Sequence, residues 1–273
     1  MLVPIISIDG PVASGKGTVA RQVAAALGFH LLDSGAIYRA HALACLMRKI
    51  EFNEINRLEE QAKALSLKFI GDSVWLDGID ATAEVRSEAV AMAASTLSAI
   101  PEVRAALLQR QRDFAVAPGL VADGRDMGTI VFPSAALKIY LTATAHVRAE
   151  RRAGQIAKQH VACLASQRMS DNPEDLAKQL IDKGKSPTIE GLLETFRAQV
   201  PDEVEDKLQG EAEHKLRRDV EAQIRRRDTQ DKSRAVAPLK PALDAIVIDN
   251  AEHSPSETVN VVLSLWKLRS ERL

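Results

Sequence analysis

A glycine-rich loop between an apolar run and a helical pattern constrains this chain more than any other feature. The apolar run Ile5–Ile8 precedes the loop, and apolar residues recur at helical spacing after it, from Val19 onward. The loop consists of Gly10, Pro11, Val12, Ala13, Ser14, Gly15, Lys16, Gly17 and Thr18. Glycines let backbone N–H groups curl around an anion, the start of the following helix adds partial positive charge, and Lys16 supplies a point charge for phosphates. The order of strand, loop and helix therefore predicts a nucleotide-phosphate site rather than a glycine-rich connecting turn.

The residue after the loop lysine sets an expectation about magnesium. A Ser or Thr there would offer its hydroxyl to Mg²⁺ directly, but this chain has Gly17, with Thr18 one place later. This variant resembles the nucleoside monophosphate kinases rather than the G proteins or motor ATPases. We therefore expect phosphates and waters to hold Mg²⁺, with the strand-end carboxylates Asp33 and Asp123 as outer-shell candidates. Helix capping or a turn is the equally open structural role for either aspartate.

Short apolar runs separated by helical stretches predict an α/β fold. Each run has the composition of a buried parallel strand, and most of them lead into helical patterning. The runs are Ile5–Ile8, Phe29–Leu32, Leu120–Ala122, Leu137–Leu141 and Ala245–Ile248. A last helix is expected to begin at the capping box formed by Ser254 and Glu257. We expect an open five-stranded parallel sheet flanked by helices.

Two stretches interrupt this alternation. From Leu65 to Thr82, apolar residues alternate around turns at Gly71 and Gly78, which predicts a small antiparallel element. From Gln155 to Arg234, the chain is rich in charge of both signs and poor in large apolar groups. This second composition predicts helices that lie on the outside or move as an enlarged lid.

The charge balance excludes a strongly cationic surface. The 36 Lys and Arg residues stand against 37 Asp and Glu residues, so the formal net charge is −1. Non-specific binding to nucleic acid or to an anionic membrane depends on a positive long-range field, and we expect neither partner. The two cysteines lack partners at metal spacing, and no apolar run approaches the ~20 residues of a membrane span. We therefore expect a cytoplasmic protein without a disulfide framework or a structural zinc site.

Three further segments carry a resemblance to a known family. They are Leu31–Arg39, Ala122–Thr129 and Asp231–Leu239. Together with the glycine-rich loop, they resemble segments of bacterial cytidylate kinase, from the N-terminus to about Glu150 and again from about Leu216 onward. The resemblance implies the P-loop fold of the nucleoside monophosphate kinases. It also implies transfer of the γ-phosphoryl group of ATP to CMP or dCMP, with Mg²⁺ as cofactor.

The resemblance also implies roles for single residues. Converging guanidiniums suit a phosphate dianion, and the positions that hold the CMP phosphate are matched by Ser34, Arg39, Arg125 and Arg234. A carboxylate suits the exocyclic amine of cytosine and an arginine suits its acceptors, and the base-recognition positions are matched by Ser95, Arg104 and Asp126. Positions that reach the sugar are matched by Arg227 and Asp231. Gln230 stands where a basic residue is expected, and we expect this departure to affect only a peripheral lid contact.

The implied nucleophile is an ionised phosphate oxygen, so the reaction needs no general base. Catalysis then requires two anions held in line and cationic charge around the transferring group. The implied catalytic residues are Lys16, Arg125, Arg227 and Arg234. Without the resemblance, an isolated arginine such as Arg104 is more typical of a solvated surface, and the run Arg225–Arg227 is typical of an exposed helix face or a nucleic-acid patch.

The resemblance implies one kinase domain over residues 1–273. We expect its core at about 1–60, 98–153 and 235–273, an acceptor-binding insertion at about 61–97 and the lid at about 154–234. The stretch from about Gln155 to Lys215 has no counterpart in the resemblance. Two alternatives remain open: a kinase of the same architecture with another acceptor, and a nucleotide-binding interaction protein that docks through this stretch. The expected partners are ATP and CMP or dCMP, and the expected state is a monomer.

Overall fold

The computed structural model describes residues 3–71, 73–156 and 202–271, without the side chains of 202–216. The expected lid insertion therefore lies mostly outside the described residues. The chain forms two units, residues 1–143 with 227–273, and residues 144–226. None of the helices in the described ranges is long and apolar enough to cross a membrane.

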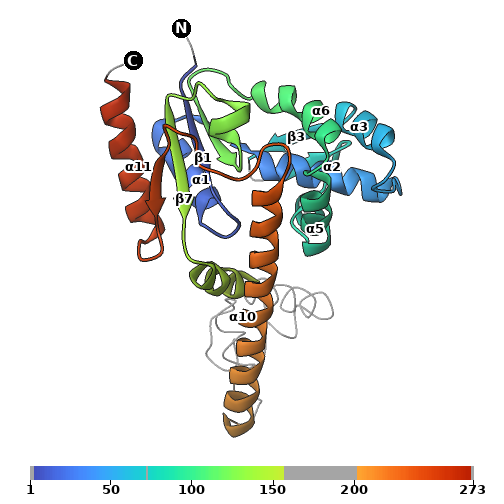
Figure 1. Ribbon diagram of the computed structural model, residues 1–273, viewed down its shortest axis with the longest axis vertical. Helices are drawn as coiled ribbons and strands as arrows, with labels where there is room; N and C mark the ends of the chain where they lie inside the picture. Colours follow the sequence, from blue (N-terminus) through green and yellow to red (C-terminus); the bar gives the residue numbers. More distant parts are fainter. Residues whose placement is uncertain (1–2, 72, 157–201, 272–273) are drawn as a thin grey trace, which may run out of the picture. The chain divides into compact units, whose positions relative to one another are not determined.

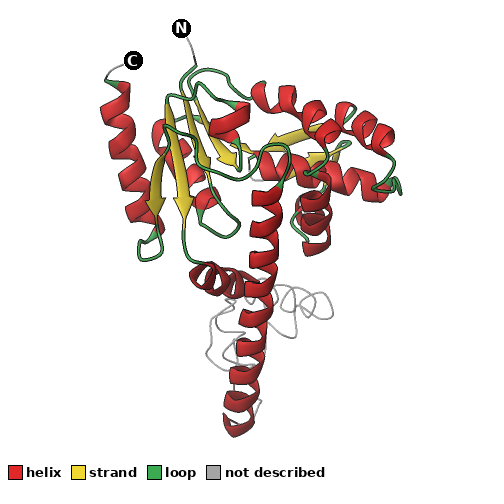
Figure 2. Ribbon diagram, viewed as in Figure 1, coloured by secondary structure: helices red, strands yellow, loops and turns green. Residues whose placement is uncertain are grey.

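A five-stranded parallel sheet forms the centre of the first unit (Figure 2). Its strands follow the order β2-β6-β1-β7-β8, and every neighbouring pair is parallel. The strands are β1 (Ile5–Asp9), β2 (His30–Asp33), β6 (Leu120–Gly124), β7 (Leu137–Thr142) and β8 (Ile246–Asp249). The predicted α/β fold and its five strands are confirmed, with each end shifted by at most two residues.

Helices cover both faces of this sheet because each strand alternates its side chains between the faces. One core joins the sheet to helices α1 (Lys16–Leu27) and α11 (Pro255–Ser270), through Val23, Val262 and other buried apolar residues. Figure 1 shows α11 running beside β7, which it contacts. The other core lies against α2 (Ser34–Met47), and Leu32 and Leu120 belong to it. Each fully buried aliphatic side chain stabilises the fold by about 1.5–3 kcal/mol.

A small insertion with its own β-sheet packs beside this second core. The antiparallel element predicted between Leu65 and Thr82 is confirmed as a three-stranded sheet in which β4 pairs with both β3 and β5. Its strands are β3 (Leu67–Ile70), β4 (Ser73–Leu76) and β5 (Ile79–Asp80). The helices around it are α3 (Ile55–Lys63), α4 (Thr82–Val85), α5 (Glu88–Leu97) and α6 (Pro101–Arg112). Contacts of α2 with α5 and of α3 with α6 hold this insertion on the core.

A π-helix and two further helices complete the fold. A single-turn π-helix η1 (Met127–Val131) follows Asp126 directly. Helix α10 (Asp202–Ser233) follows a helix over 145–156 in the second unit, and its last residues, from Arg227, belong to the first unit. Helix α11 begins with the predicted capping box, because the Ser254 side chain accepts from the Glu257 N–H and the Glu257 carboxylate accepts from the Ser254 N–H.

The strand register places the carboxyl ends of β1, β2 and β6 at the same level of the sheet. Asp9 at the end of β1 lies level with Gly124, and Asp33 at the end of β2 lies level with Asp123. The carboxyl ends of parallel strands form the edge at which α/β proteins bind ligands. The glycine-rich loop after β1 and the segment after β6 therefore meet at one place.

Candidate functional site

The glycine-rich loop is shaped to receive an anion at the start of α1. Helix α1 begins at Lys16, directly after Gly15, whose backbone is left-handed with φ of 85°. No described side chain caps this helix, and its first turn carries no acidic residue. A Cβ at Gly10 would stand 2.1 Å from the Leu141 carbonyl oxygen, so only glycine allows the loop to pass this close to β7. The N-terminus of α1 is therefore available for phosphate binding.

Lys16 lies buried beneath this loop, opposite Asp123. Its Nζ donates to the Pro11 carbonyl over 3.1 Å, and the residue is 8% exposed. Burial lowers the pKa of Lys16, and the nearby Arg125 charge lowers it further, whereas the Asp123 carboxylate acts in the opposite direction. Burial likewise raises the pKa of Asp123, against the charge of Lys16. A bound polyphosphate would stabilise the charged form of Lys16.

The site fits a magnesium ion that is held mainly by phosphates and water. Asp123 is 8% exposed, and its Oδ1 has no hydrogen-bond partner among the described residues. A Cβ at Gly17 would approach Asp123 Oδ2 to 3.1 Å, so glycine leaves room beside this carboxylate. Asp33 instead caps α2 by accepting from the Ala36 N–H over 2.9 Å, and pairs with Arg39 over 3.2 Å. No group of three or more metal-binding side chains occurs in the described ranges.

The predicted base-recognition residues Arg104 and Asp126 form a buried ion pair. Arg104 comes from α6 and Asp126 from the turn after β6, and they are 8% and 4% exposed. The guanidinium of Arg104 also donates to the Ser98 carbonyl over 3.1 Å and lies 5.8 Å from the centre of the Tyr38 ring. Burial raises the pKa of Asp126, against the charges of Arg104 and Arg234. The pair offers a carboxylate and a guanidinium, which together match a ligand edge with both a donor and an acceptor.

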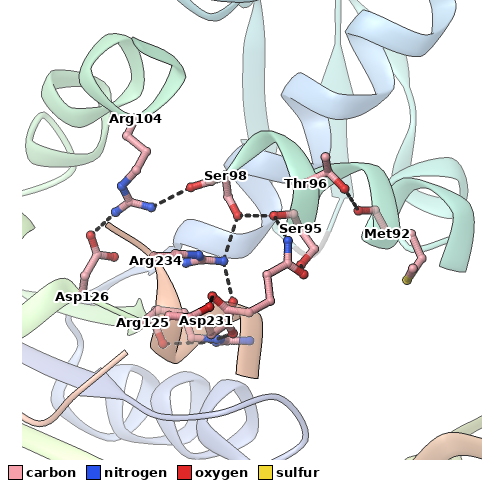
Figure 3. A network of polar contacts seen from close by, with 12 residues as sticks. Met92, Ser95, Thr96, Ser98, Arg104, Arg125, Asp126, Asp231 and Arg234 are labelled. Atoms are coloured by element: carbon pink, nitrogen blue, oxygen red, sulfur yellow. Dashed lines mark hydrogen bonds and ion pairs between the residues drawn. The ribbon is translucent and has the colours of Figure 1, made fainter. Parts of the chain in front are cut away.

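A second cluster joins the end of α10 to Arg125 and Ser98 (Figure 3). The buried carboxylate of Asp231 accepts from Arg125 Nε over 3.2 Å and pairs with Arg234. Arg234 also donates to the Ser98 hydroxyl over 3.0 Å, and Ser98 lies directly after α5. These arginines are thus held in place by a carboxylate and a hydroxyl of the protein itself.

The remaining predicted residues surround this cluster. Ser34, buried at the start of α2, donates to the Asp123 carbonyl over 2.8 Å. The Nε atoms of Arg39 and Arg227 have no hydrogen-bond partner among the described residues. Burial lowers the pKa of Arg227 to about 10, and the charge of Arg125 is the next cause. Thr18 is exposed on the first turn of α1.

Gln230 corrects one expectation. The sequence predicted only a peripheral lid contact at this position, but the structure places Gln230 against Ser95. Ser95 Oγ donates to Gln230 Oε1 over 3.1 Å, and Gln230 Nε2 donates to the Ser95 carbonyl over 3.3 Å. Gln230 therefore contacts one of the predicted base-recognition residues.

Sequence reasoning missed Asp9, which links the loop to the turn after β6. Asp9 is 5% exposed, and its two carboxylate oxygens accept from the N–H groups of Met127 and Gly128, each over 2.8 Å. Burial raises the pKa of Asp9 from 3.8 to about 7, even though the two hydrogen bonds act in the opposite direction. The only local signal is its position after an apolar strand and before Gly10.

Asp9 predicts a pH-dependent stability. Because its folded-state pKa of about 7 lies above the ordinary value of 3.8, the folded chain binds more protons than the unfolded chain between those values. The contribution of Asp9 to the free energy of unfolding therefore falls as the pH rises from about 4 to about 7. Asp9→Asn cannot ionise, so we expect the Tm of the wild type minus that of the variant to decrease between about pH 5 and about pH 8. A difference in Tm that stays constant at all pH values would contradict this. The control is Asp249→Asn, at an exposed position.

Asn250 is a second residue that sequence reasoning missed. It is 3% exposed after β8, and its Nδ2 donates to the Ser14 carbonyl of the glycine-rich loop over 2.8 Å. If the loop binds ATP, as the resemblance implies, Asn250→Ala should raise the KM for ATP about five- to tenfold, because a loop that loses one such bond spends less time in the binding conformation. Steady-state rates at varied ATP concentration measure this. The matched control is Asn260→Ala, on the exposed face of α11, and an unchanged KM for Asn250→Ala would contradict the role.

Comparisons with known proteins agree on one family. The family model described as cytidylate kinase matches residues 6–173 and 202–268. A cytidylate kinase of Chromobacterium violaceum is 43% identical over 267 residues, which cover 98% of this chain and 97% of the relative. The cytidylate kinases of Bordetella bronchiseptica and Ralstonia pickettii are 43% and 42% identical, each over 264 residues that cover 97% of this chain and 95% and 92% of the relatives. The solved structure of TT1252 from Thermus thermophilus aligns at 18% identity with a TM-score of 0.35, covering 98% of this chain and 99% of that one, a likeness too low to add to the argument.

Proposed function

Because this chain belongs to the cytidylate kinase family, we propose that it transfers the γ-phosphoryl group of ATP to CMP or dCMP by direct in-line transfer. The proposal is supported by two regions that are suited to anions and lie at one edge of the sheet. The glycine-rich loop and Lys16 form one region, and the arginines after β6 and at the end of α10 form the other. A donor and an acceptor phosphate held there would face each other.

The donor side is proposed to bind ATP through the loop from Gly10 to Thr18. The N-terminus of α1 and the charge of Lys16 would face the β and γ phosphates. Mg²⁺, when bound, supplies further positive charge to these phosphates, and Asp123 would take part in holding it through water. Asp33 already caps α2 and pairs with Arg39, so Asp123 is the stronger candidate.

The acceptor side is proposed to bind CMP through charge-assisted hydrogen bonds. Arginines suited to the phosphate are Arg39, Arg125 and Arg234, and Ser34 adds a hydroxyl at the start of α2. Arg227 and Asp231 are proposed to reach the sugar, and Ser95, Arg104 and Asp126 the cytosine. The ion pairs of Arg39 with Asp33 and of Arg125 and Arg234 with Asp231 stabilise these arginines before the substrate arrives. A phosphate dianion would take over part of this role.

The chain's own residues are proposed to act through charge and position. The attacking oxygen of CMP is ionised at neutral pH, so no residue has to remove a proton. Lys16, Arg125, Arg227 and Arg234 would spread cationic charge around the transferring group, which is the main requirement of phosphoryl transfer. In this proposal the acceptor-binding insertion covers about 61–97 and the lid about 154–234, from which Arg227, Asp231 and Arg234 enter the site.

The transfer is tested by following the label from γ-³²P-labelled ATP. With Mg²⁺ and CMP, we expect the label to appear in CDP, and no labelled protein to accumulate when CMP is omitted. Labelled inorganic phosphate as the main product would contradict the proposal, since it would mean that water is the acceptor. Running the protein on a sizing column tests the prediction that it is a monomer.

A further inference from the structure

One face of the last turns of α10 carries more than arginines and a carboxylate. Arg227 and Asp231 are four residues apart and lie on one side of the helix, and Arg234 follows directly after its last residue. Gln230 stands three residues after Arg227 and directly before Asp231, and therefore shares this side. Its amide makes both of its observed hydrogen bonds with Ser95 of α5.

These two hydrogen bonds fix which group donates and which accepts. The Ser95 carbonyl oxygen can only accept, so the atom of Gln230 that faces it over 3.3 Å has to be Nε2. The other amide atom, Oε1, then faces the Ser95 hydroxyl over 3.1 Å. Because a carbonyl oxygen can only accept, the Ser95 hydroxyl has to donate its one hydrogen to Gln230.

Neighbouring residues hold this arrangement in place. The Ser98 hydroxyl donates to the same Ser95 carbonyl over 3.0 Å, and Arg234 donates to the Ser98 hydroxyl over 3.0 Å. Figure 3 shows Ser95, Ser98 and Arg234 in one hydrogen-bonded row, with Arg104 reaching the Ser98 carbonyl from the other side. The Ser95 carbonyl thus accepts from two side chains near the end of α5, where helix carbonyls lack partners within the helix.

A ligand that meets Ser95 would therefore find lone pairs and no hydrogen. The carboxylate of Asp126, which pairs with Arg104, is likewise an acceptor. The exocyclic amine of cytosine has two hydrogens to donate. Uracil has a carbonyl oxygen at the same ring position, and that oxygen would meet only other acceptors.

Resting on the proposed function, we propose that Gln230 is a specificity-determining residue that acts through Ser95. By taking the hydroxyl hydrogen, it makes Ser95 an obligate acceptor and so favours CMP over UMP. Without Gln230, the Ser95 hydroxyl could rotate and donate its hydrogen, so Ser95 could pair with either base. Gln230 is a positioning residue in this account, because it need not touch the nucleotide.

Gln230→Met and Gln230→Glu separate this role from simple packing. Methionine has a similar length but no strong acceptor, so Ser95 regains its hydrogen for the ligand. We expect the ratio of kcat/KM for UMP to that for CMP to rise about tenfold. Glutamate keeps an acceptor for the Ser95 hydroxyl, so the ratio should stay within about twofold of the wild type even if the activity falls. Gln223→Met, at an exposed position of α10, is the matched control.

Three results decide the proposal. In the Ser95→Ala background, adding Gln230→Met should leave the UMP-to-CMP ratio unchanged, because the hydroxyl through which Gln230 acts is gone. A Gln230→Met enzyme that loses CMP and UMP activity by the same factor would overturn the proposal and leave Gln230 a structural contact. A wild-type enzyme that does not phosphorylate CMP would instead contradict the proposed function, and this inference with it.

Discussion

Lys16→Met should lower kcat by a factor of about 1,000 or more while leaving the fold intact. Lys16 is 8% exposed, and its Nζ donates to the Pro11 carbonyl of the glycine-rich loop. Methionine has a similar length, so it fills the same space without the charge that would face the transferring phosphates. ADP release measured at saturating ATP and CMP gives this loss directly.

The same variant should lose activity without losing stability. Burial and the charge of Arg125 lower the pKa of Lys16, which means that the ligand-free site disfavours its charged form. The Tm of ligand-free Lys16→Met should therefore equal or exceed that of the wild type, while the increase in Tm on adding ATP becomes smaller. Lys240→Met, at an exposed position, controls for the loss of a lysine in general. A variant that keeps about a tenth of the wild-type kcat would contradict the role of Lys16.

Asp126→Asn should change the preferred base. Arg104 can only donate, so it holds the carbonyl oxygen of the introduced amide, and the NH₂ group then faces the ligand. That group suits the carbonyl of uracil and opposes the amine of cytosine. We expect kcat/KM for CMP to fall about 100-fold or more, and the value for UMP to stay constant or rise. Steady-state rates with each nucleotide measure both changes.

The control for this variant is another aspartate–arginine pair of the same unit. Asp77 pairs with Arg48 over 2.7 Å at an exposed position, and Asp77→Asn should leave the base preference unchanged. Asp126→Asn also leaves the buried guanidinium of Arg104 with a neutral partner, so a lower Tm is expected. Equal losses with CMP and UMP would show that the variant damages the fold rather than base recognition.

Local patterns explain why the strand, the glycine-rich loop and the helix after it could be predicted. The glycine-rich loop, Lys16 and the helix after them lie within a few residues of one another, and their geometry follows from the backbone conformation of glycine and the start of a helix. The strands β1 and β6 could be predicted equally well, because parallel strands buried on both faces have continuous apolar sequences. Asp33 remained open between two roles, and the structure shows that it caps α2.

Long-range contacts explain what could not be predicted. Asp9 and Met127 are 118 residues apart, Asn250 and Ser14 are 236 apart, and Gln230 and Ser95 are 135 apart. The partners of Asp9, Asn250 and Gln230 are main-chain atoms or a hydroxyl, so no complementary charge pattern marks these contacts in the sequence. Arg104 illustrates the opposite case, since its helical neighbourhood suggests a solvated residue, although its ion pair with Asp126 is buried.

The most direct test of the central claim compares acceptors in one assay. Wild-type enzyme with ATP and Mg²⁺ is given CMP, dCMP, UMP, AMP and GMP in parallel, and ADP release is measured for each. The account predicts rapid turnover with CMP and dCMP, weak turnover with UMP, and none above background with the purine nucleotides. Turnover that favours UMP or a purine nucleotide, or ATP binding without turnover of any acceptor, would contradict it.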